Sequence, residues 1–325
     1  MPFPAVSGHP QHPPLDPGLG CTLDRWAALA RLARTDLDTA RLAEADLDAR
    51  TIMGELEGPA PDAGQRWGVW AAEPPDGIVH ATPGPDGSWR LRGTKRWCSG
   101  AGSCSHVLIS ARYGHERWLF ALDLEQPAVR PRLGEWVGLG MAGSSTGSVE
   151  LHDAVGWPVG APGAYLNRPG FWHGAIGVAA CWYGGAVGVT IPLWDAVATG
   201  RADQHTLAHL GAVDTALAAA RALLRCAAHE IDHPGVTGDA VTGDTAAWNI
   251  GVSRRRALRV RAAVEHAATT AIERVGRALG PGPLAHLPGH AQRVADLGVY
   301  LRQSHAERDL AELGVLSASD HADLA

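Results

Sequence analysis

Two histidines and a glutamate in the second half of the chain have the spacing of a zinc site. His229, Glu230 and His233 form the pattern HExxH, in which two imidazoles one helical turn apart can hold Zn²⁺ while the glutamate acts as a general base. No third histidine follows at the spacing of metalloproteases, and 16 histidines in the chain make chance matches common. We interpret the segment as a charged helix end and assign no metal site, with a zinc hydrolase as an alternative.

Two further patterns could bind phosphate. Gly138, Gly140 and Gly143 satisfy GxGxxG, but a dinucleotide loop needs a strand before it and a helix after it. The residues that follow indicate a turn and then a strand, so we expect a glycine-rich connection. A run of arginines between Arg254 and Arg261 could also hold phosphate, although such a run more often forms the solvated face of a long helix.

Composition limits the remaining classes of function. The 325 residues are 46% hydrophobic and 19% charged, which is typical of a globular protein with two or three structural units. A net charge of −6 argues against a nucleic-acid surface. We read no apolar run approaching ~18 residues and expect no membrane span. The five cysteines show no CxxC spacing and no secretory signal precedes them, which favours reduced thiols in the cytoplasm.

A β-rich stretch, Arg66–Arg112, stands between helical regions. Short runs rich in Trp, Val, Ile and Leu alternate there with Pro, Gly and Asp clusters, which is the signature of short strands joined by tight turns. We expect strands near Trp67–Ala72, Trp89–Leu91, Val107–Ser110, Trp118–Leu122 and Ser148–Leu151.

Helical periodicity covers most of the rest of the chain. The expected helices are Thr22–Leu56, Phe171–Val189, Thr206–Asp232, Thr245–Leu279 and Gln292–Leu313. Phe171–Val189 is rich in glycine and alanine, so we expect a buried helix that packs closely on its neighbours. The predicted fold is mainly α with a central small β-barrel or sheet domain. It comprises a proline-rich tail (1–21), a short helical region (22–60), a β domain (61–156) and a helical bundle (157–325).

Three motifs in this layout resemble those of the acyl-CoA dehydrogenases. Glu73-Pro74 within a glycine-ended loop is similar to that family's T-E-P loop. The segment Gly87–Ser99, GSWRLRGTKRWCS, resembles its characteristic strand pair, and Gly143–Pro158 resembles its exit from the β domain. Each motif is weak alone, but their order and spacing agree from about Thr22 to Leu313. The resemblance implies the acyl-CoA dehydrogenase-like fold, with a C-terminal four-helix bundle.

The resemblance also implies FAD, a homodimer or homotetramer, and a small-molecule substrate, possibly an acyl thioester. In the family, FAD lies between the β domain and the bundle. By position, Val69, Ala71 and Ala72 would border the flavin ring, Trp97 would pack on it, and Ser99 would bond near its reactive nitrogen. A flat aromatic side chain and a hydroxyl donor suit a flavin whose reduced ring is negatively charged. The alternative for Trp97 is a buried strand aromatic.

The chain departs from the family at three places. Ala72 replaces a threonine, which removes one flavin hydrogen bond, and the N-terminal helical region is several helices shorter. The catalytic glutamate of most members falls on or near Ser304, and the position used by other members falls near Val178. We therefore predict His305 as the catalytic base, because imidazole suits proton transfer near neutral pH. The alternative for His305 is an exposed, charged helix surface.

Three functions follow from the resemblance and its departures. The first is an FAD-dependent oxidoreductase whose usual catalytic glutamate is not in its expected place. The second is a flavin-dependent monooxygenase-like enzyme of the same fold, some of which use a histidine at this point. The third is a flavin-free homologue that acts as a binding or scaffold subunit.

Overall fold

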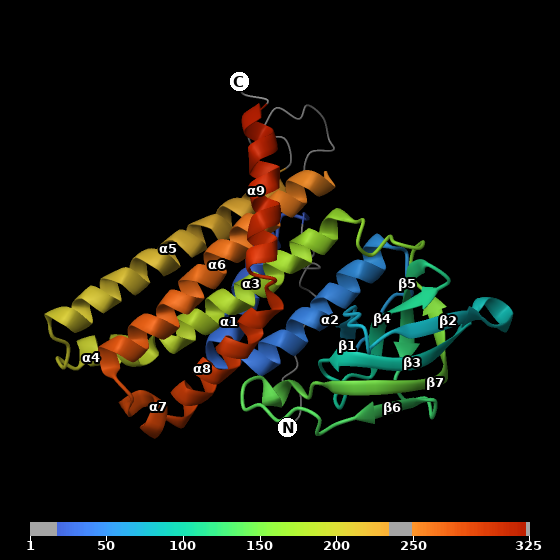
Figure 1. Cartoon of the computed structure of the whole chain (residues 1–325), viewed down its shortest axis with the longest axis horizontal. Coiled ribbons are helices and arrows are strands. Elements are labelled where there is room, and N and C mark those ends of the chain that lie inside the picture. Colours follow the sequence, from blue (N-terminus) through green and yellow to red (C-terminus); the bar gives the residue numbers. More distant parts are fainter. Residues whose placement is uncertain (1–17, 234–248, 323–325) are drawn as a thin grey trace. The chain divides into compact units, whose positions relative to one another are not determined.

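The computed structural model describes residues 18–233 and 249–322, which form two compact units (Figure 1). The helical unit comprises the chain up to Ala40, the segment Leu139–Met141 and the chain from Trp172 onward. The β unit comprises Arg41–Gly138 and Ala142–Phe171.

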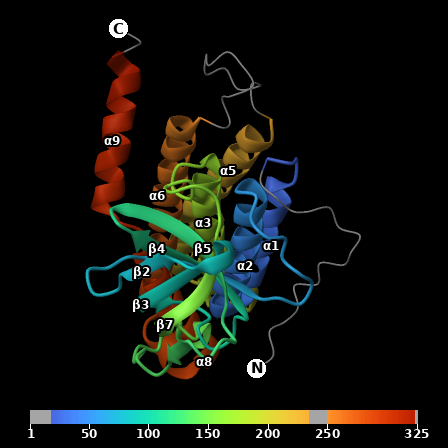
Figure 2. The same cartoon turned by 90° about the vertical axis from the view of Figure 1, so that its right-hand side faces the viewer.

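Seven strands form one sheet in the described part of the chain. They are β1 (Trp67–Trp70), β2 (Val79–Pro83), β3 (Trp89–Cys98), β4 (His106–Tyr113), β5 (Glu116–Asp123), β6 (Val129–Arg132) and β7 (Gly147–Pro158). Strands β4, β2, β3, β7 and β5 pair in that order, and β5 pairs back with β4, which closes a five-stranded ring (Figure 2). Strand β1 lies parallel to β4 outside the ring, and β6 is antiparallel to β7. The predicted small β-barrel is thereby confirmed.

Strand β4 shows how the barrel is filled and covered. Val107, Ile109 and Ala111, at every second position, are fully buried in the cluster inside the ring. Leu108 points to the other face, because side chains alternate along a strand. It belongs to a second apolar cluster with Trp67 of β1.

Helix α2 (Leu37–Glu55) supplies the other side of that second cluster. Ala49, Ile52 and Met53 are buried there, so the helix beyond Ala40 is grouped with the strands. The β unit therefore begins at Arg41 and ends at Phe171, whereas the domain boundaries that we predicted follow residues 60 and 156.

Two strands were not predicted. Strand β2 ends at Pro83, and β6 contains Pro131 between two arginines. Proline cannot donate a ladder hydrogen bond and is confined to strand ends and edges. Strand β6 is such an edge, since β7 is its one partner among the described residues.

The helical unit confirms the predicted bundle. Its helices are α1 (Thr22–Thr35), α3 (Pro169–Val189), α4 (Ile191–Ala198), α5 (Gln204–Asp232), α6 (Ile250–Leu279), α7 (Gly282–His286), α8 (Pro288–Tyr300) and α9 (Glu307–Ala322). The first three residues of α3 belong to the β unit, and the helix belongs to the helical unit from Trp172 onward. Helices α5 and α6 pack side by side (Figure 1). The predicted start of α6 at Thr245 lies outside the described residues. Its predicted end is confirmed, because Gly280 follows with a φ of 64°.

Glycines of α3 allow α1 to approach closely, as the sequence predicted. A Cβ on Gly184 would lie 2.2 Å from the carbonyl oxygen of Ala30, and one on Gly188 would lie 2.5 Å from that of Arg34. Neither position has room for a side chain.

Two predicted helices are each broken in two. The helix expected over Thr22–Leu56 is interrupted at Asp36, whose carboxylate accepts hydrogen bonds from the backbone N–H and the hydroxyl of Thr39. Asp36 thus caps the start of α2. The helix expected over Gln292–Leu313 ends at Tyr300, and α9 begins after a turn in which Ala306 has a φ of 46°.

Length and composition alone would allow two helical stretches to cross a membrane, contrary to our sequence reading. They are Pro169–Ala198, which is 72% buried, and Gln204–Asp232, which is 22% buried. Buried core helices of soluble proteins meet the same criteria, and the 72% burial of Pro169–Ala198 is typical of such a helix.

Candidate active site

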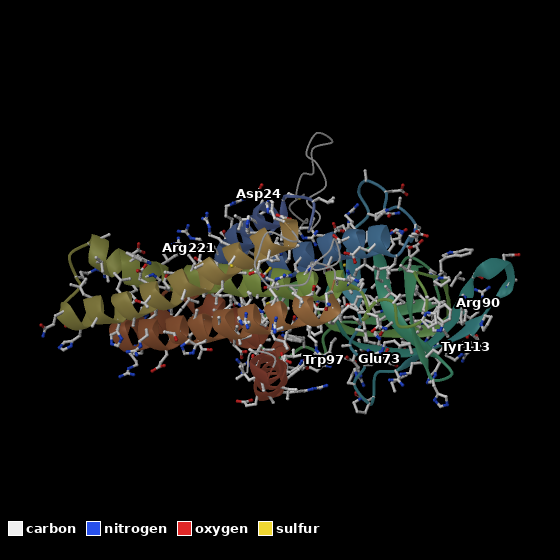
Figure 3. The ribbon with its side chains drawn as sticks, turned by 90° about the horizontal axis from the view of Figure 1, so that it is seen from above. Asp24, Glu73, Arg90, Trp97, Tyr113 and Arg221 are labelled. Atoms are coloured by element: carbon white, nitrogen blue, oxygen red, sulfur yellow. The ribbon has the colours of Figure 1, made fainter. Side chains whose placement is uncertain are left out.

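Trp97 has an unusual backbone and an exposed ring. The pairing of β3 with β7 shifts register between Lys95 and Cys98, and Trp97 inside this irregularity has a φ of 61°. A large non-glycine residue is strained in that region. The indole is 61% exposed, so Trp97 is not the buried strand aromatic of the alternative interpretation. Figure 3 labels it among the side chains of the β unit.

Ser99 lies at the end of a chain of hydroxyls. Thr146 donates to Ser99 Oγ at 3.2 Å, and Ser144 and Thr146 share a hydrogen bond of 2.8 Å. The described residues offer no acceptor to the Ser99 hydroxyl proton. Ser99 can therefore donate to a ligand, which is the role the sequence predicted for it.

The segment Val69–Ala72 lies next to Ser99. The indole N–H of Trp70 donates to the Ser99 carbonyl oxygen at 2.9 Å, which joins the end of β1 to the end of β3. Val69 and Ala71 are half-buried, and Ala72 is exposed. The five residues predicted to border a flavin thus belong to one unit, and their contact with a flavin stays a prediction.

The surroundings of Trp97 combine apolar surface with charge. Trp136 meets it edge to face with ring centroids 6.2 Å apart. Val137, the next residue in the chain after Trp136, is 95% exposed. The guanidinium of Arg96, the residue before Trp97, lies 3.3 Å from Asp76 and 3.5 Å from Glu135. A flat apolar ligand would cover exposed carbon here, so the residues present fit a flavin ring.

A buried charged network behind this wall was missed by the sequence reasoning. Lys95, which is 0% exposed, donates to the carbonyl oxygen and to the hydroxyl of Ser110, both at 2.8 Å. The Ser110 hydroxyl reaches Glu73 at 2.8 Å and the Ala71 carbonyl oxygen at 3.3 Å. Arg112 and Arg117 donate to the same Glu73 carboxylate. The network therefore joins the predicted flavin-bordering segment to β3, β4 and β5.

The network shifts the pKa values of its members. Burial lowers the pKa of Lys95 to about 8, although the nearby Glu73 charge opposes that shift. Burial also pushes the pKa of Glu73 upward, but hydrogen bonds from Arg117 and Ser110 outweigh it and hold that pKa below its usual value. One sequence signal was present: Glu73 and Lys95 both fall inside motifs of the resembling family.

His305 lies in the helical unit, in the turn before α9. Its Nδ1 is 3.2 Å from Asp309 Oδ1, and its backbone N–H donates to the other oxygen of that carboxylate. A carboxylate can only accept, so Nδ1 carries the proton of the neutral ring and Nε2 keeps its lone pair. The side chain is 68% exposed. This geometry suits a base, and that role stays a prediction.

The HExxH segment is the end of α5. The His229 and His233 rings stack with centroids 4.5 Å apart, and Glu230 accepts a hydrogen bond from Arg256 at 2.6 Å. Across the described residues, no group of three or more metal-ligating side chains comes together.

The GxGxxG glycines lie in the connection between β6 and β7. Within the helical unit, Asp296 of α8 accepts a hydrogen bond from the Met141 backbone at 2.7 Å. Gln292 donates to the Leu139 carbonyl oxygen and to Asp296. A Cβ on Gly140 would lie 2.3 Å from the Ala295 carbonyl oxygen. The glycine therefore permits close approach to α8 rather than to a phosphate.

No protein-family model matches the sequence, and no curated protein matches it. Solved structures do match. TdsC from Paenibacillus sp. A11-2, in complex with FMN and indole, is 20% identical with a TM-score of 0.74, over 90% of this chain and 82% of that one. The chain has the acyl-CoA dehydrogenase-like fold.

Two other structures share the acyl-CoA dehydrogenase-like fold with this chain. KijD3, in complex with FMN and a dTDP-amino-keto-sugar, is 19% identical with a TM-score of 0.77, over 94% of this chain and 80% of that one. Methanesulfinate monooxygenase MsuC from Pseudomonas fluorescens is 16% identical with a TM-score of 0.76, over 92% and 83%. At these identities the likeness shows the fold alone.

Proposed function

We propose that the chain is a flavin-dependent oxidoreductase with a monooxygenase-type reaction on a small molecule. The observation that carries the flavin is the exposed, strained Trp97 beside the Ser99 hydroxyl, whose proton no described residue accepts. Both FMN and FAD are compatible with these residues. Among the structures that share the fold, those of TdsC and KijD3 contain FMN, and TdsC and MsuC are named as monooxygenases.

The chain's own residues would bind and orient the cofactor. A bound flavin supplies two-electron redox chemistry: it accepts a hydride, and when reduced it passes electrons to dioxygen. Trp97 would cover one ring face, and Ser99 would donate its hydroxyl proton to a ring acceptor. The Lys95–Ser110–Glu73 network would hold the Ala71 backbone in place behind them.

The absence of an acidic base separates the two flavin reactions. Acyl-CoA dehydrogenation requires a group that removes the α-proton, but by the family resemblance the two glutamate positions fall on or near Ser304 and near Val178, where this chain has no glutamate. No Asp or Glu lies between Asp153 and Asp195. His305, which hydrogen-bonds to Asp309, is the residue that we predict as the base instead. Oxygen activation has no such need for a carboxylate, which favours the monooxygenase.

A dehydrogenase acting on an acyl thioester through His305 is the second candidate, and a flavin-free binding or scaffold protein is the third. We also propose a homodimer or homotetramer, on the basis of the family resemblance, and a cytoplasmic location, on the basis of the five cysteines without CxxC spacing.

Oxygen and substrate tests separate these functions. With flavin bound, consumption of dioxygen that depends on NAD(P)H and a flavin reductase would support the monooxygenase. Anaerobic bleaching of the flavin by an acyl-CoA panel would support the dehydrogenase instead. In either enzyme, His305→Ala should abolish turnover without releasing flavin, and unchanged kinetics would reject His305 as the base.

A further inference from the structure

A row of chemically distinct side chains crosses three strands of the β unit. In the register of the sheet, Trp67 of β1 lies opposite His106 of β4, which lies opposite Asp123 of β5. Opposite residues point to the same face of a sheet. Ala121 is two positions from Asp123 on β5, so the two side chains point to the same face. Ala121 in turn lies opposite Trp157 of β7. Sheet register alone thus brings two indoles, an imidazole and a carboxylate to one surface.

This surface lines an open pocket of about 500 Å³. Asp62 and Gln65, in the segment before β1, line it as well. Trp67 is 4% exposed and its ring lies tilted against that of His106 with centroids 4.8 Å apart, whereas Trp157 is 50% exposed. The volume lies within the range of small-molecule sites.

The two glutamine side chains that line the pocket are hydrogen-bonded within the protein. The Gln65 amide accepts from the Trp67 indole at 3.0 Å and donates to one oxygen of Asp62. The Gln126 amide bonds to the backbone of Asp123 and of Val155. The second oxygens of Asp62 and Asp123 accept no hydrogen bond from any described residue. Both of these carboxylates are exposed.

The charged residues that line the pocket favour a positively charged ligand. Two carboxylates line it, and of its described lining residues none is a lysine or an arginine. Aromatic faces attract cations through the ring quadrupole, and tryptophan does so best. A cation with an apolar body would satisfy both features, whereas an anion would meet two like charges.

We propose that this pocket binds a protonated amine with an aromatic or aliphatic body. The body would lie against Trp157, and the ammonium group would donate to Asp62 and Asp123. The site is separate from the residues proposed to hold a flavin and does not depend on that function.

Calorimetric titration with three probes of one shape tests the proposal. The probes are 2-phenylethylamine, 2-phenylethanol and 3-phenylpropionate, which differ in charge at pH 7. We expect the amine to bind with a dissociation constant on the order of 1 mM and to quench Trp157 fluorescence. The neutral alcohol should bind about tenfold more weakly, and the carboxylate should not bind. Equal binding of all three, or no binding of the amine at about 20 mM, would overturn the proposal.

Isosteric variants locate the site. Asp123→Asn keeps the side-chain oxygen that accepts from the Glu125 backbone and removes the charge, so amine binding should weaken about tenfold without loss of fold. Asp62→Asn should act in the same direction. Asp86→Asn serves as the control, because Asp86 is exposed in a turn with a φ of 59°, which asparagine adopts readily. Equal losses in Asp86→Asn and Asp123→Asn would reject the assigned pocket.

Discussion

Trp97 occupies a backbone conformation that its side chain does not favour. Strain at a large exposed residue persists where the surrounding structure enforces it, and here the register shift between β3 and β7 does so. The indole contributes little burial in return, because 61% of it is exposed. A residue with these properties is explained more readily by ligand binding than by folding.

The first prediction separates strain from packing at Trp97. Trp97→Gly should change the free energy of unfolding by less than about 1 kcal/mol, because relief of strain offsets the lost edge contact with Trp136. Trp70→Ala is the comparison: this ring is 2% exposed, and its removal should cost about 3–5 kcal/mol. Urea unfolding measures both. Similar losses in the two variants would mean that Trp97 serves the core.

The second prediction concerns the residue that replaces the family's threonine. Ala72→Thr should tighten flavin binding by about threefold to tenfold, the worth of one net hydrogen bond. Ala72→Val has nearly the same shape without the hydroxyl and should give no gain. Fluorescence titration with FMN and FAD measures both variants. An equal gain in Ala72→Val would assign the effect to packing instead of a hydrogen bond.

The third prediction follows from the buried Lys95. Its folded pKa is lowered to about 8 from 10.5, so between these pH values the unfolded chain binds more protons than the folded one. The free energy of unfolding should therefore gain a rising contribution from pH 8 to 10.5. Lys95→Met should lack this contribution when unfolding is measured across the same range. Parallel pH profiles for the two proteins would contradict the assignment.

At the scale of elements, Asp36 separates α1 from α2. Helical periodicity continues through this position, so periodicity alone predicted one helix. The fourth prediction is that Asp36→Ala lowers the free energy of unfolding by about 1 kcal/mol, while Asp36→Asn, which keeps an N-cap acceptor, lowers it by much less. Thermal unfolding of both variants measures the difference. An equal effect of the two substitutions would argue against capping.

The glycine-rich connection offers a matched pair of positions. A Cβ on Gly140 would overlap the Ala295 carbonyl oxygen at 2.3 Å, whereas one on Gly138 would meet a single atom of Trp136 at 3.6 Å. The fifth prediction is that Gly140→Ala destabilises the protein by at least about 2 kcal/mol and that Gly138→Ala changes little. Urea unfolding of the two variants provides the measurement. Tolerance of alanine at Gly140 would show that α8 does not pack as described.

Elements with strong periodicity were predictable, and those decided by cross-strand partners were not. Strands β1, β4 and β5 carry dense runs of apolar residues and were found, whereas β2 and β6 were hidden by proline and charge. The break before α9 was also missed, because Ser304 and Ala306 resemble ordinary helix residues in sequence. Their turn depends on hydrogen bonds to the Ser304 and Asp309 side chains, which the apolar period does not reveal.

At the scale of the whole molecule, the order of helices, barrel and bundle was predicted from motifs and is shared with solved structures. Trp97, Ser99 and the Val69–Ala72 segment lie in one unit, and their contact with a flavin stays a prediction. The Lys95–Ser110–Glu73 network was not predicted, because it joins residues that only barrel closure brings together. His305 lies in the other compact unit, and its role in catalysis rests on the resemblance.

Flavin binding is the central claim and can be measured directly. Purified protein titrated with FMN and with FAD should bind at least one of them with a dissociation constant of about 10 μM or lower. Trp97→Gly should weaken that binding by tenfold or more, worth about 1.4 kcal/mol, whereas Trp157→Ala, which removes an exposed tryptophan elsewhere in the β unit, should leave it unchanged. A well-folded wild-type protein that binds neither flavin at about 1 mM would contradict the account.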